Sequence, residues 1–98
     1  LIDLFEVEIE KNSSDISFVK SYDDIISNKK ISAFLTIEEG EAIEESIDNL
    51  EHFYNRGVRM MTLTWNFENS IGFGNKRVIK DGKLVGYIPD TETKAVWI

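Results

Sequence analysis

The sequence predicts an α/β fold, in which three strands and two helices alternate as a βαβαβ segment that is followed by a β-hairpin. Three β-prone runs, residues 16–19, 31–37 and 58–64, alternate with two segments of helical periodicity. Their short connections favour parallel strands with right-handed crossovers. Asp81-Gly82 then separates two further β-prone runs, and this dipeptide is typical of a two-residue type I′ hairpin turn.

The N-terminal part of the chain predicts a helix, a brief strand and a second short helix. Residues 1–12 place apolar side chains near helical spacing among acidic ones. Ser21 is a favoured N-cap residue, and Asp24 three positions later makes a weaker variant of the capping box. This pair predicts a two-turn helix over residues 22–28.

The central part of the chain carries the clearest strand and helix patterns. Residues 31–37 are nearly all apolar or β-prone, which predicts a parallel strand that is buried on both faces. After Gly40, residues 41–56 repeat apolar side chains at steps of three and four, which predicts an amphipathic helix. Gly57 is a natural stop for that helix.

Composition excludes several classes of protein. The net charge is −7 and the basic residues are scattered, so we expect no nucleic-acid partner. The absence of cysteine excludes a disulfide scaffold and a thiolate metal site. No apolar run approaches the ~20 residues of a membrane span, and no signal peptide is visible, so a cytoplasmic location is the default expectation.

The length and the two ends of the chain predict a fragment. Ninety-eight residues suit one small domain or a slice of a larger one, and no linker divides them. The sequence begins at Leu1 and ends on the apolar Ile98, so both ends look cut. We therefore expect residues 1–98 to be a single fragment of a longer chain.

Two places in this fold are candidates for chemistry, because functional residues of parallel α/β proteins gather at the carboxyl ends of strands. Glu38 follows the strand at 31–37, and Trp65-Asn66 follow the strand at 58–64. From the residues alone, Glu38 is either a functional carboxylate or an acid favoured by a helix N-terminus. His52 is the single histidine, which favours an ordinary helix residue over a metal ligand.

Residues 31–40, 50–66 and 68–69 resemble the membrane (renal) dipeptidase family of zinc metallopeptidases. The family pattern is an apolar strand ending Ile-Glu-Gly-Gly, a helix ending Tyr-x-x-Gly-Val-Arg, and a strand ending Leu-Thr-His-Asn or Leu-Thr-Trp-Asn. The corresponding residues of this chain are Ile37-Glu38-Glu39-Gly40, Tyr54-Asn55-Arg56-Gly57-Val58-Arg59 and Leu63-Thr64-Trp65-Asn66.

This resemblance implies a segment of a (β/α)8 TIM-type barrel that holds two zinc ions and hydrolyses dipeptides with a metal-bound hydroxide. Glu38 takes the place of the glutamate that bridges both metals, so it is the metal ligand and the catalytic residue of our prediction. Trp65 and Asn66 fall on the substrate side. The chain corresponds to about three βα units of that barrel, with the hairpin at 77–88 following them.

The chain also departs from the family pattern. Glu39 replaces the first glycine of the glutamate motif, and Trp65 stands where some members have a substrate-contacting histidine. The His-x-Asp pair and the two later histidines that complete the zinc sites are missing, so we expect no turnover from this chain alone. The alternative is a non-catalytic binding or self-associating module, which would form a homo-oligomer through exposed strand edges.

Overall fold

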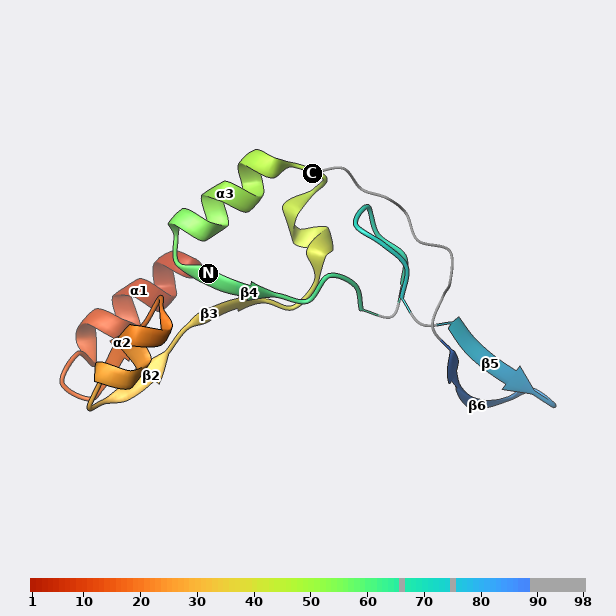
Figure 1. Cartoon of the computed structure of the whole chain (residues 1–98), viewed down its shortest axis with the longest axis horizontal. Helices are drawn as coiled ribbons and strands as arrows, with labels where there is room; N and C mark the ends of the chain where they lie inside the picture. The colour runs from red at the N-terminus through yellow and green to blue at the C-terminus, as the bar shows by residue number, and fades with distance from the viewer. Residues whose placement is uncertain (66, 75, 89–98) are drawn as a thin grey trace. The chain divides into compact units, whose positions relative to one another are not determined.

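The computed structural model describes residues 1–65, 67–74 and 76–88. Figure 1 shows the elements in chain order, which are α1 (Ile2–Lys11), β1 (Ile16–Phe18), α2 (Tyr22–Ser27), β2 (Ile31–Ala33), β3 (Leu35–Ile37), the 3-10 helix η1 (Gly40–Ile43), α3 (Ile47–Asn55), β4 (Val58–Met61), β5 (Lys76–Lys80) and β6 (Lys83–Ile88). The mixture of helices and strands confirms the α/β class. The chain divides into two compact units, residues 1–36 with 51–60, and residues 37–50 with 61–98.

The first unit contains a parallel βαβ element formed by β1, α2 and β2. The two strands pair in the register Ile16↔Ile31, Ser17↔Ser32 and Phe18↔Ala33. One further backbone bond extends this pairing, from the Val19 N–H to the Ala33 carbonyl at 2.9 Å. The parallel direction that the short connection predicted is therefore confirmed for this pair.

The predicted N-cap of α2 is present. The Ser21 hydroxyl accepts the Asp24 N–H at 3.1 Å, and the Asp24 carboxylate accepts the Lys20 N–H at 2.9 Å. The hydrogen bond from the Lys20 backbone, with that from Ser21, lowers the pKa of Asp24 below its ordinary value. The cap thus depends on an ionised carboxylate as well as on a hydroxyl.

Helix α1 is joined to the rest of the first unit by one arginine and one aromatic contact. Arg56, at the end of α3, forms ion pairs with Asp3 and with Glu6, the latter at 3.0 Å. The hydrogen bond from Arg56 lowers the pKa of Asp3. The Phe5 and Phe18 rings meet edge to face, with centroids 5.0 Å apart. The ion pairs of Arg56 join segments that are 50 and 53 positions apart in the sequence.

Gly57 ends α3 as the sequence predicted. Its φ of +99° is in the left-handed region that glycine adopts without strain, and its N–H donates to the Tyr54 carbonyl at 2.9 Å. A Cβ at this position would overlap Cζ of Phe18. Both the turn and the neighbouring ring therefore require glycine.

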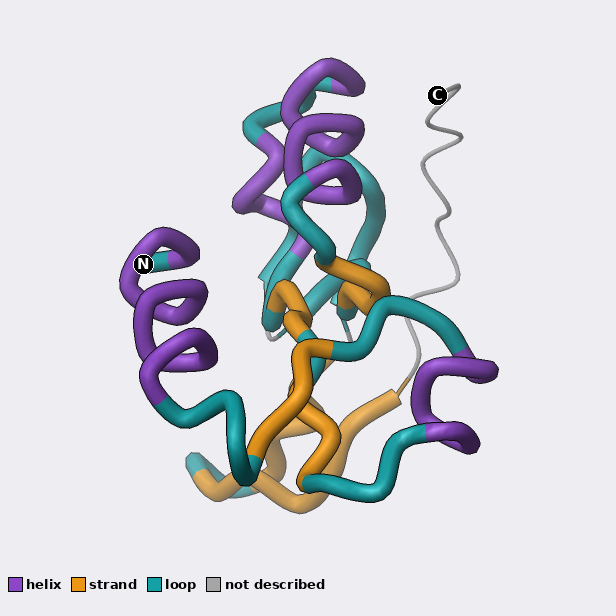
Figure 2. Tube along the Cα trace, turned by 90° about the vertical axis from the view of Figure 1, so that its left-hand side faces the viewer, coloured by secondary structure: helices purple, strands orange, loops and turns teal. Residues whose placement is uncertain are grey.

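The strand predicted over residues 31–37 is split, and the prediction that it is buried on both faces is wrong. Phe34 interrupts it, so β2 pairs with β1, whereas β3 belongs to a separate two-stranded sheet with β4. Ile31 is 65% exposed and Phe34 is 47% exposed. Burial on both faces requires layers on both sides, and the described residues do not supply them here. Figure 2 shows how short the strand segments are.

The helix predicted over residues 41–56 begins six positions later, at Ile47. Glu44 and Glu45 both adopt left-handed backbone angles, with φ of +51° and +59°, and they separate η1 from α3. The Ser46 hydroxyl then accepts the Asn49 N–H at 3.2 Å, as a capping serine does. Glu44 and Glu45, which lie inside the predicted helix, thus form the linker before α3.

The second unit contains the β5–β6 hairpin. The strands are antiparallel, with a bulge between Val78 and Ile79. Asp81 and Gly82 have φ of +51° and +72°, and positive values at both positions are what a type I′ turn requires. The hairpin predicted from this dipeptide is confirmed. None of the described helices has the length and apolar character needed to cross a membrane.

The lowered pKa of Asp24 gives the cap of α2 a predictable dependence on pH. A carboxyl whose folded pKa is lowered contributes stability above its unfolded pKa, about 3.9, and that stability is lost as pH falls through the folded value. We expect Asp24→Asn to lower the free energy of unfolding at neutral pH and to reduce its loss in acid. Urea unfolding followed by circular dichroism at neutral and acidic pH measures both.

Asp23→Asn is the matched control for this prediction. It removes the same charge from the neighbouring position, but the hydrogen bonds to Lys20 and Ser21 remain. Equal pH profiles for the two variants would show that the cap of α2 does not depend on the ionised Asp24.

Candidate functional site at the carboxyl ends of β3 and β4

The carboxyl ends of β3 and β4 lie together in the second unit. Ile37 is the last residue of β3, and its carbonyl accepts the N–H of Thr62, the first residue after β4, at 3.0 Å. The segment that starts with Glu38 and the segment that leads to Trp65 therefore leave the sheet at the same end of the two strands. Both segments follow the carboxyl ends of strands that the sequence predicts.

Glu38 lies in the bend directly after β3, and its side chain is exposed. No hydrogen bond or ion pair to another described residue engages its carboxylate, so both oxygens are available to a ligand. Glu39 is half-buried and occupies the N-cap position of η1, but its side chain makes no capping hydrogen bond. The exposed Glu38 does not require a protein partner, because the cost of an unpaired carboxylate applies only to a buried one.

Gly40 is buried because the β4 end and a later loop pack directly against it. A Cβ at this position would overlap Cδ1 of Ile71 and would lie 2.6 Å from the Leu63 carbonyl oxygen. The glycine is therefore required by close packing and not by its backbone angles. This contact explains why the glutamate motif keeps a glycine two positions after Glu38.

Asn69 organises the loop that packs on Gly40, a role that the sequence did not predict. Its Nδ2 donates to the Leu63 carbonyl at 2.8 Å, and its Oδ1 accepts the N–H groups of Ile71 and Gly72 at 2.9 and 3.2 Å. Only 6% of Asn69 is exposed. The available signal was an asparagine in a Gly- and Ser-bearing loop, where its side chain commonly bonds the backbone two residues later.

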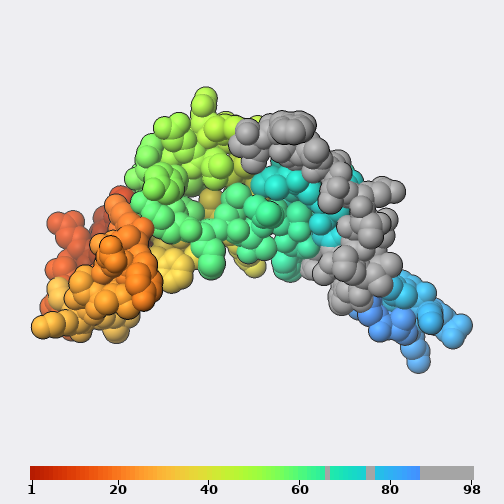
Figure 3. Space-filling model, viewed as in Figure 1, coloured from red at the N-terminus to blue at the C-terminus, as the bar shows by residue number. Residues whose placement is uncertain are grey.

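Trp65 is 56% exposed, and Asn66 lies outside the described residues. Thr64, next to Trp65, donates from its hydroxyl to the Phe73 carbonyl at 3.4 Å. Figure 3 shows the loop residues, in cyan, against the green residues at the β4 end. The loop is thus attached to both residues that precede Trp65, while no contact joins Trp65 to Glu38 directly. The catalytic role of Glu38 and the substrate-side roles of Trp65 and Asn66 stay predictions.

The described residues do not form a complete metal site. Across 1–65, 67–74 and 76–88, no group of three or more His, Cys, Asp or Glu side chains is arranged to hold a metal ion. Zinc sites in enzymes use three protein ligands or more. Glu38 fits such a site as one carboxylate donor, and the described part of the chain does not supply the others.

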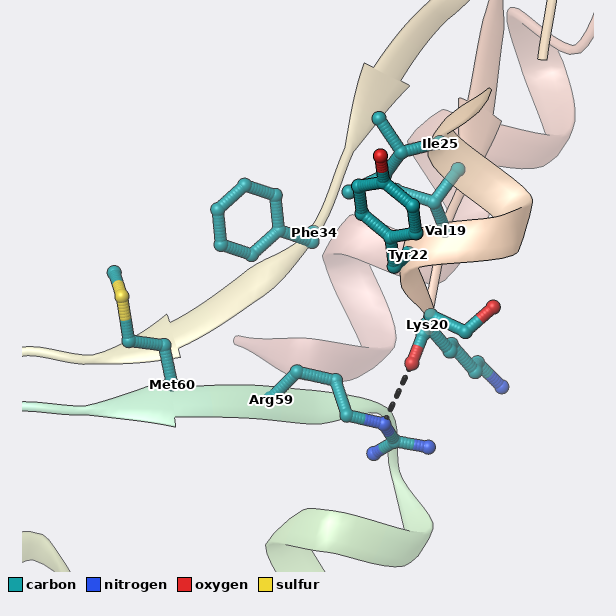
Figure 4. A pocket seen from close by; sticks show the side chains of 8 residues that line it. Val19, Lys20, Tyr22, Ile25, Phe34, Arg59 and Met60 are labelled. Atoms are coloured by element: carbon teal, nitrogen blue, oxygen red, sulfur yellow. Dashed lines mark hydrogen bonds between the residues drawn. The ribbon is translucent and has the colours of Figure 1, made fainter. Parts of the chain in front are cut away.

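A groove of about 390 Å³ lies in the first unit, and it contains neither Glu38 nor Trp65. Figure 4 shows its lining, which is mainly apolar and comprises Val19, Lys20, Ser21, Tyr22, Ile25, Phe34, Arg59 and Met60. Arg59 borders the groove in a fixed position, because its guanidinium donates to the carbonyls of Lys20 and Tyr54 and stacks on the Tyr54 ring. The arginine therefore serves the local structure.

Comparison with known proteins decides the family. The sequence profile of membrane dipeptidase (peptidase family M19) matches residues 1–83. The chain belongs to the membrane dipeptidase family. The match includes the glutamate motif, the Gly57 turn and the β4 end, and it also extends over α1 and β1, which the motifs did not cover.

One curated relative is an uncharacterized protein in the PQQ-III 3′ region of Acinetobacter calcoaceticus. It is 31% identical over 67 residues, which make up 68% of this chain and 21% of the relative. The chain therefore spans about a fifth of the length of this relative. Activity and substrate of a whole protein do not follow from a match of this extent.

The packing on Gly40 makes a prediction about stability. Gly40→Ala places a methyl group against Ile71 and the Leu63 carbonyl, so we expect it to cost about 1–3 kcal/mol. Ile71→Ala in the same chain removes one of the two obstacles, so the double variant recovers part of the loss. The hydrogen-exchange rate of the Thr62 N–H, which donates to Ile37 at the end of the β3–β4 pair, measures this loss of stability by NMR.

Gly72→Ala is the matched control within the same loop. Its new Cβ meets only Cγ2 of Thr64, at the ordinary contact distance of 3.6 Å. Equal changes in the hydrogen-exchange rate of the Thr62 N–H in Gly40→Ala and Gly72→Ala would contradict the packing role of Gly40.

Proposed function

We propose that this chain is a barrel segment of a zinc dipeptidase and that it supplies Glu38 as the bridging metal ligand of the complete enzyme. The observation that carries the proposal is the position of Glu38. It is an exposed carboxylate directly after β3, at the edge where the β4 end also emerges. Family membership gives that position a chemistry, because members resemble (β/α)8 barrels with active sites at the carboxyl ends of strands.

A carboxylate suits this role for a simple reason. The two oxygens of Glu38 would each hold a divalent cation, which a neutral amide would hold less strongly. Zinc at such a site would activate water for hydrolysis of a peptide bond at neutral pH. One donor does not assemble such a centre, so the isolated 98-residue chain is expected to be inactive.

Trp65 and Asn66 form the substrate side of the proposed site. The exposed indole offers an apolar face for a dipeptide side chain, and it follows the same strand end that packs on Gly40. Indole does not accept and donate a proton near neutral pH as imidazole does. Trp65 therefore acts through contact with the substrate, and the preference among dipeptides is set by the shape of this face.

The proposal is tested by Glu38→Gln in the complete polypeptide that carries this segment. Glutamine keeps the size of the side chain but loses its charge. We expect one zinc ion to be lost or to bind more weakly. We also expect kcat to fall by at least about 100-fold, because metal stabilisation of the transition state is worth several kcal/mol. Zinc content and dipeptide turnover are measured together.

Glu39→Gln provides the control, since it makes the same change at the neighbouring position. Zinc content and turnover of this variant are expected to stay close to those of the parent. A Glu38→Gln enzyme with full zinc content and full activity would refute the proposed role.

The second candidate is a non-catalytic, self-associating module, which the exposed apolar surface favours. Among the described residues only Val19, Ile43 and Val58 are buried hydrophobic side chains. In contrast, Ile31 of β2 is 65% exposed, on a strand whose described partner is β1 alone. Such a strand edge pairs readily with another chain.

This candidate predicts that the mass of the 98-residue chain in solution rises with concentration. Ile31→Lys should then return it to the monomer, because a charge at an edge opposes pairing. Light scattering after size-exclusion chromatography makes the measurement. A strict monomer at every concentration would exclude self-association.

A further inference from the structure

We infer that Asn69 is a positioning residue, which holds the β3 and β4 ends together and thereby sets where Glu38 lies relative to Trp65. What the site does rests on the proposed function. The clamp, by which we mean the link that Asn69 makes between the β3 and β4 ends, rests on contacts among described residues of the second unit. The clamp and the proposed function are tested separately.

The contacts of Asn69 use both the donor and the acceptor of its side-chain amide. The NH₂ group donates to the Leu63 carbonyl at 2.8 Å, and the oxygen accepts two backbone N–H groups, from Ile71 and Gly72. The Asn69 backbone N–H also donates to the Gly72 carbonyl at 3.0 Å. The side chain therefore closes its own loop and joins that loop to the β4 end.

The Leu63 carbonyl transmits this clamp to the glutamate motif. The same oxygen that accepts the Asn69 amide would lie 2.6 Å from a Cβ on Gly40, so the two backbones touch there. Ile71, whose N–H Asn69 fixes, also packs against Gly40, beside the Leu63 carbonyl. Gly40 is two positions after Glu38, and Leu63 is two positions before Trp65. Asn69 thus extends the strand pairing past its last backbone bond, from Thr62 to Ile37.

Asparagine suits this position better than other side chains of its size. The clamp needs one donor and one acceptor on a short side chain, and an ionised aspartate has no donor for the Leu63 carbonyl. Alanine leaves the Leu63 carbonyl and two N–H groups without their partner, which is costly because these hydrogen bonds are partly buried around an Asn69 that is only 6% exposed. Residues that orient a metal ligand typically change affinity or activity about 10- to 100-fold when removed.

The first experiment compares amide NMR spectra of the 98-residue chain with those of N69A and N69D, using N12A as control. Asn12 also donates its side-chain amide to a backbone carbonyl, that of Glu8, but on α1. We expect N69A to shift the signals of residues 38–40 and 62–65 together. Shifts confined to loop residues 69–73 would overturn the inference, because Asn69 would then only shape its own loop.

N69D keeps the inference testable if N69A does not fold. An ionised carboxyl repels the Leu63 carbonyl, whereas a protonated one donates to it and still accepts from the loop. We therefore expect the signals of residues 38–40 in N69D to return toward the parent positions as the introduced carboxyl is protonated. Signals of residues 38–40 that do not change as the introduced carboxyl is protonated would contradict the clamp.

The second experiment measures kcat and KM for a dipeptide in the complete enzyme. We expect N69A to lower kcat by about 10- to 100-fold with a smaller change in KM, since the displaced group is Glu38. Unchanged kcat in an active enzyme would overturn the positioning role. An inactive parent enzyme would instead remove the proposed function, and the NMR result would still decide whether Asn69 joins the two strand ends.

Discussion

The Leu63 carbonyl oxygen is the point at which three backbone segments of the candidate site meet. It abuts Gly40 after β3, it belongs to the segment after β4, and it accepts the buried amide of Asn69 from the following loop. This packing is possible only because residue 40 has no side chain. The location of Glu38 at the shared strand edge depends on it, since a bulkier residue would push the two strand ends apart.

Polar contacts order much of the chain because its apolar core is small. The described residues bury three hydrophobic side chains, whereas many large ones remain exposed. In the first unit, the register of β1 and β2, the Ser21 cap and the Arg56 ion pairs therefore define positions that packing alone would leave open. Exposed ion pairs stabilise weakly, so their effect here is chiefly to fix geometry.

The family of this chain and the metal ligands that it provides together define its contribution to the proposed enzyme. The membrane dipeptidase profile matches most of the chain, yet no metal-binding cluster of described residues surrounds Glu38, the candidate donor after β3. In the proposed enzyme this segment would provide one ligand and one wall of the substrate site. The rest of the metal centre would be supplied by other parts of the barrel.

Local patterns fixed several elements in advance because they depend on neighbours in the sequence. The Ser21 cap, the Gly57 turn and the Asp81-Gly82 hairpin need only backbone angles and short-range hydrogen bonds, and all three are present. Burial of residues 31–37 was not predictable, since it depends on what covers a strand. The start of α3 was missed because Glu44 and Glu45 have helix-favouring side chains but adopt left-handed angles.

The sequence by itself determined the class of the fold, the family and the candidate carboxylate, because each is written in residue types at fixed spacing. Only the tertiary structure revealed the role of Asn69. Its partners at Leu63, Ile71 and Gly72 are brought together by the path of the loop, and the link to Gly40 crosses from one strand end to another. A side chain that acts by joining distant backbone atoms leaves no periodic pattern in the sequence.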